Sequence, residues 1–201
     1  MTRVIAGEAG GRRLAVPAGR DTRPTSDRAR EGLFATIASM MGSLAGTRML
    51  DLYAGSGAVG LEALSRGAGH VLLVESGARA GRVIRANIEA IGLPGAEVVT
   101  DRVERVLARG PDSSAIQDRY DVVFADPPYA QPDQEVSGML ETLAGRDWLA
   151  PGALVIVERA TRSGPVSWPA GFTADRARRY GEATFWYARG ASDLSHLPAE
   201  H

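Results

Sequence analysis

The sequence of 201 residues contains no cysteine, no lysine and only three histidines. Without cysteine the chain can have neither a disulfide framework nor a thiolate metal site. His70, His196 and His201 lack the spacing of zinc ligands. We therefore expect no metal cofactor. The missing lysines reflect genome composition and indicate no particular chemistry.

Long apolar runs are also missing. No run approaches the roughly 20 residues of a membrane span, and the opening "MTRVIAGEAGG" has no apolar signal-peptide segment behind its arginine. Hydrophobic residues make up 44% and charged residues 23% of the chain, which are ordinary globular values. We expect a cytoplasmic protein without a membrane partner, built as one domain with a small extension.

Positive charge is concentrated at the start of the chain. The net charge is −1, but residues 1–48 hold eight arginines against four acids, a net of +4, so the remaining residues carry −5. A basic N-terminal part on an acidic body is typical of proteins that bind nucleic acid. We expect the N-terminal part to contact a polyanion.

The first 45 residues are patterned as an extension of their own. The runs "TRVIAG" and "RRLAVP" predict two strands of a hairpin that bends at Gly10 and Gly11. "TSDRAREGLFATIASMMG" predicts a helix that Thr25 or Ser26 can cap and Gly42 ends. Its apolar stripe is formed by Ala29, Leu33, Phe34, Ile37 and Met41. We expect residues 1–45 to form a hairpin and helix that dock RNA.

From residue 46 the pattern becomes a strand–helix alternation. Short, continuous apolar runs predict parallel strands covered on both faces, at 47–53, 70–75, 96–100, 120–126 and 153–158. Helices are expected over 57–67, 77–92, 102–109 and 133–145. The end, "FTADRARRYGEATFWYARG", predicts an antiparallel edge hairpin around Tyr180–Glu182. The predicted fold is an open, doubly wound α/β sheet over 46–190, mostly parallel, followed by a tail at 191–201.

The stretch "LDLYAGSGAVG" contains a dinucleotide-binding fingerprint with one residue that departs from the usual pattern. Gly55, Gly57 and Gly60 form G-x-G-x-x-G, but Asp51 stands where a dinucleotide strand carries an apolar residue. Three further acids, Glu75, Asp101 and Asp126, follow successive predicted strands. The carboxyl ends of parallel strands meet at one sheet edge, so these charges would repel a pyrophosphate. They favour S-adenosylmethionine, which has a sulfonium, an ammonium and no phosphate.

Each residue of this predicted cofactor site has a chemical role. Gly55 and Gly57 allow a sharp turn and close approach of the backbone. Asp51 can accept from the ligand ammonium or from turn amides, Glu75 from two ribose hydroxyls and Asp101 from the adenine amino group. Glu75 alone does not distinguish the cofactors, because NAD enzymes use the same device. The predicted set is completed by Ala54, Ser76, Arg102 and Asp126.

A second motif, "VVFADPPYA", indicates the reaction. Asp126, Pro127, Pro128 and Tyr129 follow directly after a buried strand, and the prolines fix the turn. The lone pair of a ring-conjugated amine is delocalised, so the amine is a poor nucleophile. A carboxylate and a backbone carbonyl that accept its N–H bonds orient that lone pair, and Tyr129 offers a face on which the base stacks. We expect these four residues to be catalytic.

Together, "DLYAGSG", "VLLVE", "ADPPY" and "RPTSDRAREGLF" resemble the RsmD-type methyltransferases over most of the chain. The resemblance implies a class I, Rossmann-like methyltransferase that modifies the exocyclic N2 of a guanine in 16S ribosomal RNA, naked or within a small subunit or its assembly intermediate. It implies that the stretch with Arg23, Thr25 and Arg28 helps to receive RNA. We expect Arg12 and Arg13 of the hairpin to contribute.

Four other functions remain open. A DNA adenine-N6 methyltransferase shares D-P-P-Y but usually needs an additional recognition domain. A protein-glutamine methyltransferase more typically has Asn in place of Asp126. An NAD(P) dehydrogenase leaves Asp51 and D-P-P-Y without a role. A non-enzymatic RNA-binding assembly factor accounts for the basic N-terminal part but not for an intact glycine loop.

Overall fold

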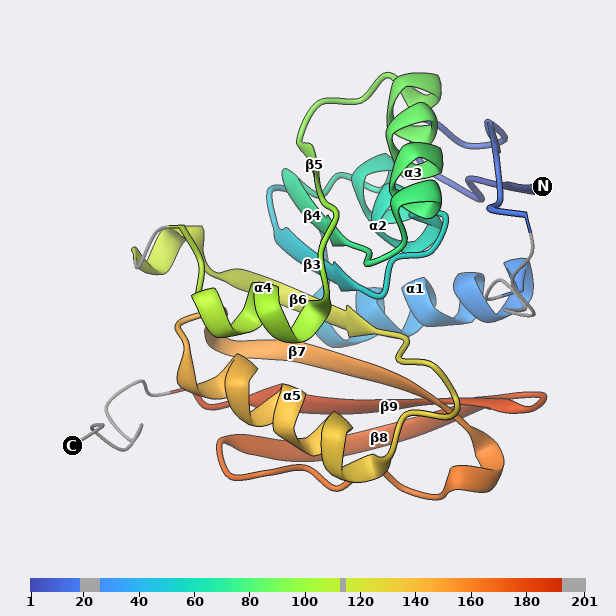
Figure 1. Ribbon diagram of the computed structural model, residues 1–201. Coiled ribbons are helices and arrows are strands. Elements are labelled where there is room, and N and C mark those ends of the chain that lie inside the picture. The colour runs from blue at the N-terminus through green and yellow to red at the C-terminus, as the bar shows by residue number, and fades with distance from the viewer. Residues whose placement is uncertain (19–25, 113–114, 193–201) are drawn as a thin grey trace. The chain divides into compact units, whose positions relative to one another are not determined.

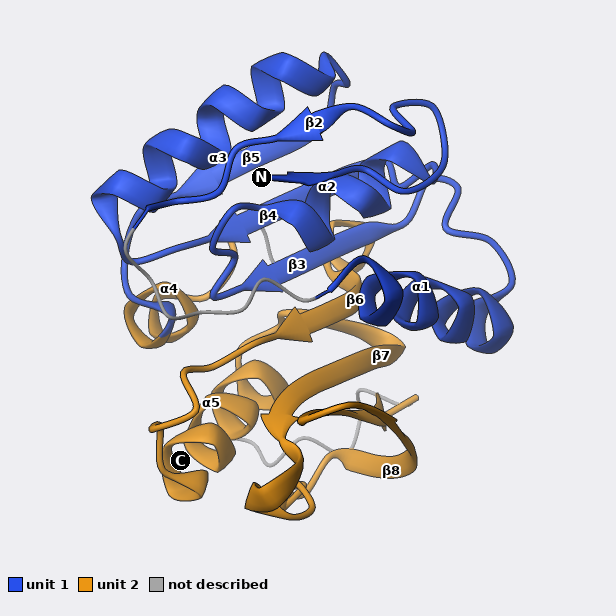
Figure 2. Ribbon diagram, turned by 90° about the vertical axis from the view of Figure 1, so that its right-hand side faces the viewer, with its two compact units in different colours: residues 1–103 blue, residues 104–201 orange. Residues whose placement is uncertain are grey.

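The computed structural model describes residues 1–18, 26–112 and 115–192. The chain forms two compact units, residues 1–103 and 104–201, which Figure 2 draws in different colours. Within the described residues, no helix is long and apolar enough to cross a membrane. Each unit is built from strands and helices in the predicted order.

Unit 1 begins with a short hairpin. Strands β1 (Thr2–Arg3) and β2 (Arg13–Leu14) pair antiparallel, and Gly11 turns with φ +84°. The predicted strands are longer, and Arg12 lies just before β2 rather than on it. Backbone pairing continues through Val4, whose amide donates to the Arg12 carbonyl at 2.9 Å, and it stops beyond that point, where the Ile5 and Ala6 amides donate to the Glu62 carboxylate of α2 (Ala58–Ser65).

Helix α1 (Asp27–Met41) follows the prediction closely. The Ser26 hydroxyl caps it by accepting from the Ala29 amide at 3.1 Å, and the helix ends before Gly42, whose φ is +80°. Ala29, Leu33, Phe34 and Ile37 are buried as predicted, whereas Met41 is half-buried. The helix also buries Arg30, which the apolar pattern does not include.

The sheet of unit 1 consists of three adjacent parallel strands. Their order is β5 (Ala96–Val99), β4 (His70–Val74) and β3 (Arg48–Leu52), and they are connected through helices α2 (Ala58–Ser65) and α3 (Ala78–Ile91). Figure 1 shows these two helices beside the three strands. β3 and β4 are almost fully buried, as their continuous apolar runs predict. The three strands end on the same side, which gathers the loops that follow them.

Unit 2 has four strands, with β6 and β7 parallel and β9 antiparallel to both β7 and β8. Its elements are α4 (Val103–Arg109), η1 (Ile116–Asp118), β6 (Tyr120–Ala125), α5 (Asp133–Gly145), β7 (Leu149–Ala160), η2 (Thr161–Ser163), β8 (Phe172–Tyr180) and β9 (Ala183–Gly190). β7 begins four residues before the prediction, because Leu149 already pairs with Tyr120 ahead of a register irregularity. Gly181 turns the predicted terminal hairpin with φ +63°.

The predicted fold class is confirmed: unit 1 has three parallel strands with helices and a separate two-stranded N-terminal sheet, and unit 2 has two parallel strands followed by an antiparallel hairpin at the C-terminal end, again with helices. The division into residues 1–45, 46–190 and 191–201 stays a prediction.

Candidate functional site

The glycine loop after β3 is a tight turn held by backbone hydrogen bonds. The Ala54 amide donates to the Val74 carbonyl of β4 at 2.9 Å, and the Gly57 amide donates to the Ala54 carbonyl at 2.7 Å. Positive φ angles occur at Gly55 (+60°), at Gly57 (+79°), which begins α2, and at Tyr53 (+61°). The loop therefore needs left-handed backbone at three positions, of which only two are glycine.

The three glycines of the motif differ in what surrounds them. A Cβ at Gly60 would lie 2.8 Å from Val71 Cγ1, and one at Gly57 would lie 3.1 Å from Leu73 Cδ2. A Cβ at Gly55 would meet no heavy atom of the described residues within 4 Å. Gly60 and Gly57 thus serve the packing of α2 on β4, whereas Gly55 borders open space that a ligand can enter.

Asp51 is buried inside the turn. Its Oδ2 accepts from the Gly60 amide at 2.9 Å. Burial raises the pKa of Asp51 to about 7; the Gly60 hydrogen bond acts in the opposite direction, and the charge of Glu75 adds to the increase. The Asp51 carboxyl group braces the first turn of α2 and can change its charge near neutral pH.

Glu75, directly after β4, is also buried and joins two loops. Its Oε2 accepts from the Gly55 amide at 2.9 Å and its Oε1 from the Gly77 amide at 2.8 Å. Gly77 is the residue before α3, so one carboxylate connects the glycine loop to the start of the next helix. Each carboxylate oxygen has a second acceptor position in addition to these bonds.

The remaining predicted cofactor residues of unit 1 lie beside these two. Asp101, beyond β5, is half-buried, and its Oδ1 accepts from the Arg102 amide at 2.7 Å. Ser76 and Arg102 are exposed. Because β3, β4 and β5 are adjacent and parallel, the structure brings Asp51, Glu75 and Asp101 to one end of the three-stranded sheet of unit 1.

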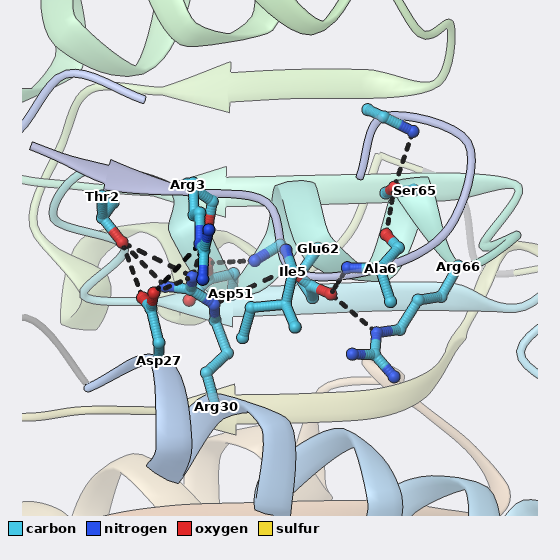
Figure 3. A network of polar contacts seen from close by, with 12 residues as sticks. Thr2, Arg3, Ile5, Ala6, Asp27, Arg30, Asp51, Glu62, Ser65 and Arg66 are labelled. Atoms are coloured by element: carbon cyan, nitrogen blue, oxygen red, sulfur yellow. Dashed lines mark hydrogen bonds and ion pairs between the residues drawn. The ribbon is translucent and has the colours of Figure 1, made fainter. Parts of the chain in front are cut away.

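A buried carboxylate in α2 connects the N-terminal segment to the glycine-loop helix. Glu62 is 0% exposed, and its oxygens accept from the amides of Ile5 at 2.7 Å and Ala6 at 3.0 Å. The Nε of Arg66 donates to Glu62 Oε1 at 2.7 Å, and the Nε of Arg30 lies 3.7 Å from Oε2 (Figure 3). Burial lowers the pKa of Arg30, and the charge of Glu62 partly offsets this decrease. Residues 1–6, α1 and α2 thus meet at a single carboxylate.

The D-P-P-Y turn of unit 2 follows β6. Pro127 is buried, Asp126 is half-buried, and Tyr129 is 50% exposed, an unusual exposure for a large aromatic side chain. The Gln131 amide donates to the Pro128 carbonyl at 2.8 Å and closes the turn. The turn therefore presents a carboxylate and an aromatic ring from a fixed backbone.

The predicted RNA-binding residues that the structure describes are exposed. Arg13 lies on β2 and Arg28 in the first turn of α1. Arg12 is also exposed, but its guanidinium donates to the Ile91 carbonyl in the last turn of α3. Arg23 and Thr25 lie outside the described residues. Arg12 thus has a structural contact within unit 1 in addition to any contact with a ligand.

Sequence reasoning missed Glu62, Arg30 and Arg159. Glu62 interrupts an apolar stretch, and Arg30 is four residues before Phe34 on the buried face of α1, so both could have been recognised as charges at core positions. Arg159 follows the apolar run of β7 and is 4% exposed, but no spacing rule identifies its partners. Among the described residues, no cluster of histidine and acidic side chains could hold a metal ion.

Comparisons with known proteins agree with this fold and these motifs. The chain is 33% identical over 199 residues to the ribosomal RNA small subunit methyltransferase D of Escherichia coli K12, covering 95% of this chain and 93% of that protein. It is 33% identical over 157 residues to the putative rRNA methyltransferase YlbH of Bacillus subtilis, covering 78% and 81%. The solved structure of the putative methyltransferase yhhF from Escherichia coli has a TM-score of 0.81 at 30% identity and covers 96% of this chain and 99% of that one. A family profile described as Conserved hypothetical protein 95 matches residues 2–189. The chain therefore belongs to this family.

Proposed function

We propose that this chain transfers a methyl group from S-adenosylmethionine to the exocyclic N2 amine of a guanine in 16S ribosomal RNA. The D-P-P-Y turn of unit 2 carries the proposal. It combines the half-buried carboxyl group of Asp126 with the half-exposed ring of Tyr129 on a turn that two prolines stiffen. An acceptor and an aromatic face that stand this close together on a stiff turn can hold and stack a base.

The residues of unit 1 fit S-adenosylmethionine. The open space beside Gly55 admits a ligand against the backbone, and the carboxyl groups around it suit a cationic ligand rather than a pyrophosphate. Asp51 accepts from the ammonium, Glu75 from the ribose hydroxyls and Asp101 from the adenine amine. Ala54, Gly57, Ser76 and Arg102 line the same loops, and Asp126 completes the set. When bound, the cofactor supplies an electrophilic methyl group on sulfur.

The residues of unit 2 prepare the nucleophile. Asp126 and the Pro127 carbonyl accept hydrogen bonds from the two N–H groups of the guanine amine, so that its lone pair is directed at the methyl group. The N–C bond would form as the S–C bond breaks, with S-adenosylhomocysteine as the leaving group, and the Asp126 carboxylate would take the proton that the amine loses. Tyr129 stacks on the base, and Pro127 and Pro128 keep these acceptors in place before the substrate arrives. These residues would accelerate the transfer by orienting a weak nucleophile.

The RNA substrate is supported by the names of the relatives and by the basic N-terminal part. Arg12, Arg13 and Arg28 are exposed within the net +4 segment, and Arg23 and Thr25 belong to the same stretch. Phosphate contacts of this kind supply affinity without sequence preference. The substrate is 16S RNA in the cytoplasm, within a small subunit or an assembly intermediate.

A nucleoside analysis tests the proposal. 16S RNA, small subunits and genomic DNA from cells that lack the gene are each incubated with the protein and labelled S-adenosylmethionine and digested, and the nucleosides are identified by mass spectrometry. We expect N2-methylguanosine in RNA treated with the wild-type protein and none in RNA treated with Asp126→Ala. N6-methyladenine in DNA, or no product together with tight RNA binding, would overturn the proposal in favour of a DNA methyltransferase or an assembly factor. Calorimetry with S-adenosylmethionine and NAD separates the two cofactors.

A further inference from the structure

Arg159, near the end of β7, contacts the backbone of the D-P-P-Y turn. It is 4% exposed, and its guanidinium reaches three acceptors. One terminal nitrogen lies 3.5 Å from the Pro128 carbonyl oxygen. The other donates to the Gln131 carbonyl and to Asp133 Oδ1, both at 2.9 Å. One planar group thus joins the turn after β6, the segment beyond it and the first residue of α5.

The composition of the turn explains why the donor is a side chain. Pro127 and Pro128 have no amide hydrogen, so two consecutive residues cannot hold the turn by donating hydrogen bonds of their own. At these two positions the backbone can be held only through carbonyl groups, which need donors from elsewhere. The Gln131 amide donates to the Pro128 carbonyl, and Arg159 donates to the carbonyls of Pro128 and Gln131.

Burial of the Arg159 guanidinium is expected to add little to the stability of the fold. Desolvation of a guanidinium is costly, and an apolar residue often replaces a buried ion pair without loss of stability. The carboxylate partner, Asp133, has a side chain that is 66% exposed, so water screens much of the attraction. What a smaller apolar side chain could not supply is a pair of directed donors to the turn.

We propose that Arg159 is a positioning residue for methyl transfer, a role that rests on the proposed function. It acts through the backbone of residues 128–131 and keeps Asp126 and Tyr129 at the place where they receive the base. A shift of reacting groups by about 1 Å can cost about 10²-fold in rate. Loss of Arg159 should therefore reduce turnover more than it reduces stability or cofactor affinity.

The test compares Arg159→Met with Arg189→Met. Arg189, on β9 of the same unit, is half-buried and also donates to a backbone carbonyl, that of Gly152 at 3.3 Å. The measurements are kcat and KM for 16S RNA, the dissociation constant for S-adenosylmethionine, the melting temperature and hydrogen exchange of the amides at 129–131. Arg159→Lys, which keeps the charge but not the planar pair of donors, is a third variant.

We expect Arg159→Met to lower kcat about 10- to 100-fold and to accelerate exchange at 129–131, with cofactor affinity changed less than about 2-fold. Arg159→Lys should recover part of kcat, and Arg189→Met should resemble wild type. Unchanged kcat in Arg159→Met overturns the inference, as does an equal loss in both methionine variants. If wild-type protein forms no N2-methylguanosine, the proposed function fails; accelerated exchange specific to Arg159→Met would still show that Arg159 holds the turn.

Discussion

The two candidate site loops of this protein are held by different kinds of buried side chain, carboxyl groups in unit 1 and a guanidinium in unit 2. In unit 1 the carboxyl groups of Asp51 and Glu75 accept from the amides of the glycine loop and of the α3 start. In unit 2 the Arg159 guanidinium donates to carbonyls of a diproline turn. The kind of buried side chain thus matches the backbone groups that it binds: amides of Gly55, Gly60 and Gly77 in unit 1, and carbonyls in unit 2, where prolines have removed the amides.

The largest effect is expected where a buried charge holds whole segments together. Glu62→Ala removes the acceptor of the Ile5 and Ala6 amides and leaves Arg30 without its buried partner, which should cost about 3–5 kcal/mol of unfolding free energy. Urea unfolding measures this loss. Glu89→Ala, at an exposed position of α3, is the control and should stay within about 0.5 kcal/mol of wild type. A stable Glu62→Ala protein would show that the N-terminal segment is not anchored there.

The same contacts bear on how the N-terminal part is tested. Removal of the hairpin would expose the Glu62 carboxyl group and disturb unit 1, so truncation cannot separate RNA docking from folding. Point variants of exposed arginines separate them.

Asp51 should make the stability of the ligand-free protein depend on pH. Its folded-state pKa, about 7, lies above its ordinary value of 3.8, so between these values the folded protein holds a proton that the unfolded chain has lost. The contribution is therefore fully present below pH 4 and is lost as the pH rises through 7, in total on the order of 4 kcal/mol. Urea titrations at several pH values should show this decline, and Asp51→Asn should flatten it. Identical pH profiles for the two proteins would contradict a buried, protonated Asp51.

Asp126→Ala should lower the rate of methyl transfer and leave the affinity for S-adenosylmethionine almost unchanged. Loss of a positioned acceptor typically lowers the rate about 10²-fold or more, equivalent to about 3 kcal/mol, while cofactor affinity should change much less. Single-turnover methylation of 16S RNA and calorimetry with S-adenosylmethionine measure the two quantities. Normal turnover would remove Asp126 from the catalytic role.

Glu75→Ala should have the opposite profile. If its oxygens hold the ribose in addition to the Gly55 and Gly77 amides, S-adenosylmethionine should bind about 1–3 kcal/mol more weakly. RNA affinity in the absence of cofactor should be nearly unchanged. Equal losses of cofactor and RNA binding would indicate a folding defect, which circular dichroism of the variant would reveal.

The smallest effect concerns single arginines of the N-terminal part. Arg13→Ala should reduce the log–log slope of RNA affinity against salt by roughly 0.7–0.9, the value for one lost phosphate contact. Arg82→Ala, at an exposed position of α3 in the same unit, should leave the slope unchanged. Filter binding at several salt concentrations distinguishes them, and equal slopes for both variants and wild type would argue against docking through the hairpin.

Much of the fold could be predicted because its signals are local. The Ser26 cap, the Gly42 stop and the continuous apolar runs of the parallel strands each depend on a few adjacent residues. The early start of β7 could not be predicted, because Leu149 is in a strand only through its pairing with Tyr120. The shortness of the N-terminal hairpin has a similar origin, since a distant carboxylate takes the amides that a longer ladder would use.

In the candidate site, too, local features could be predicted and long-range contacts could not. The glycine loop and D-P-P-Y were evident from spacing, but the residues that hold them in place were not. Glu62 and Arg159 act on segments far away in the sequence, and the value of such a contact is set by geometry that no periodicity encodes.

The left-handed backbone of Tyr53 has a thermodynamic consequence. A non-glycine residue with φ +61° is held there at a cost of roughly 1–2 kcal/mol, which the rest of the fold must offset. This residue immediately precedes Ala54 and Gly55 of the glycine loop. Tyr53→Gly would relieve this strain and so stabilise the folded state, but it would also make the start of the glycine loop more flexible. Maximal thermostability and a preorganised cofactor loop are therefore competing demands at this position.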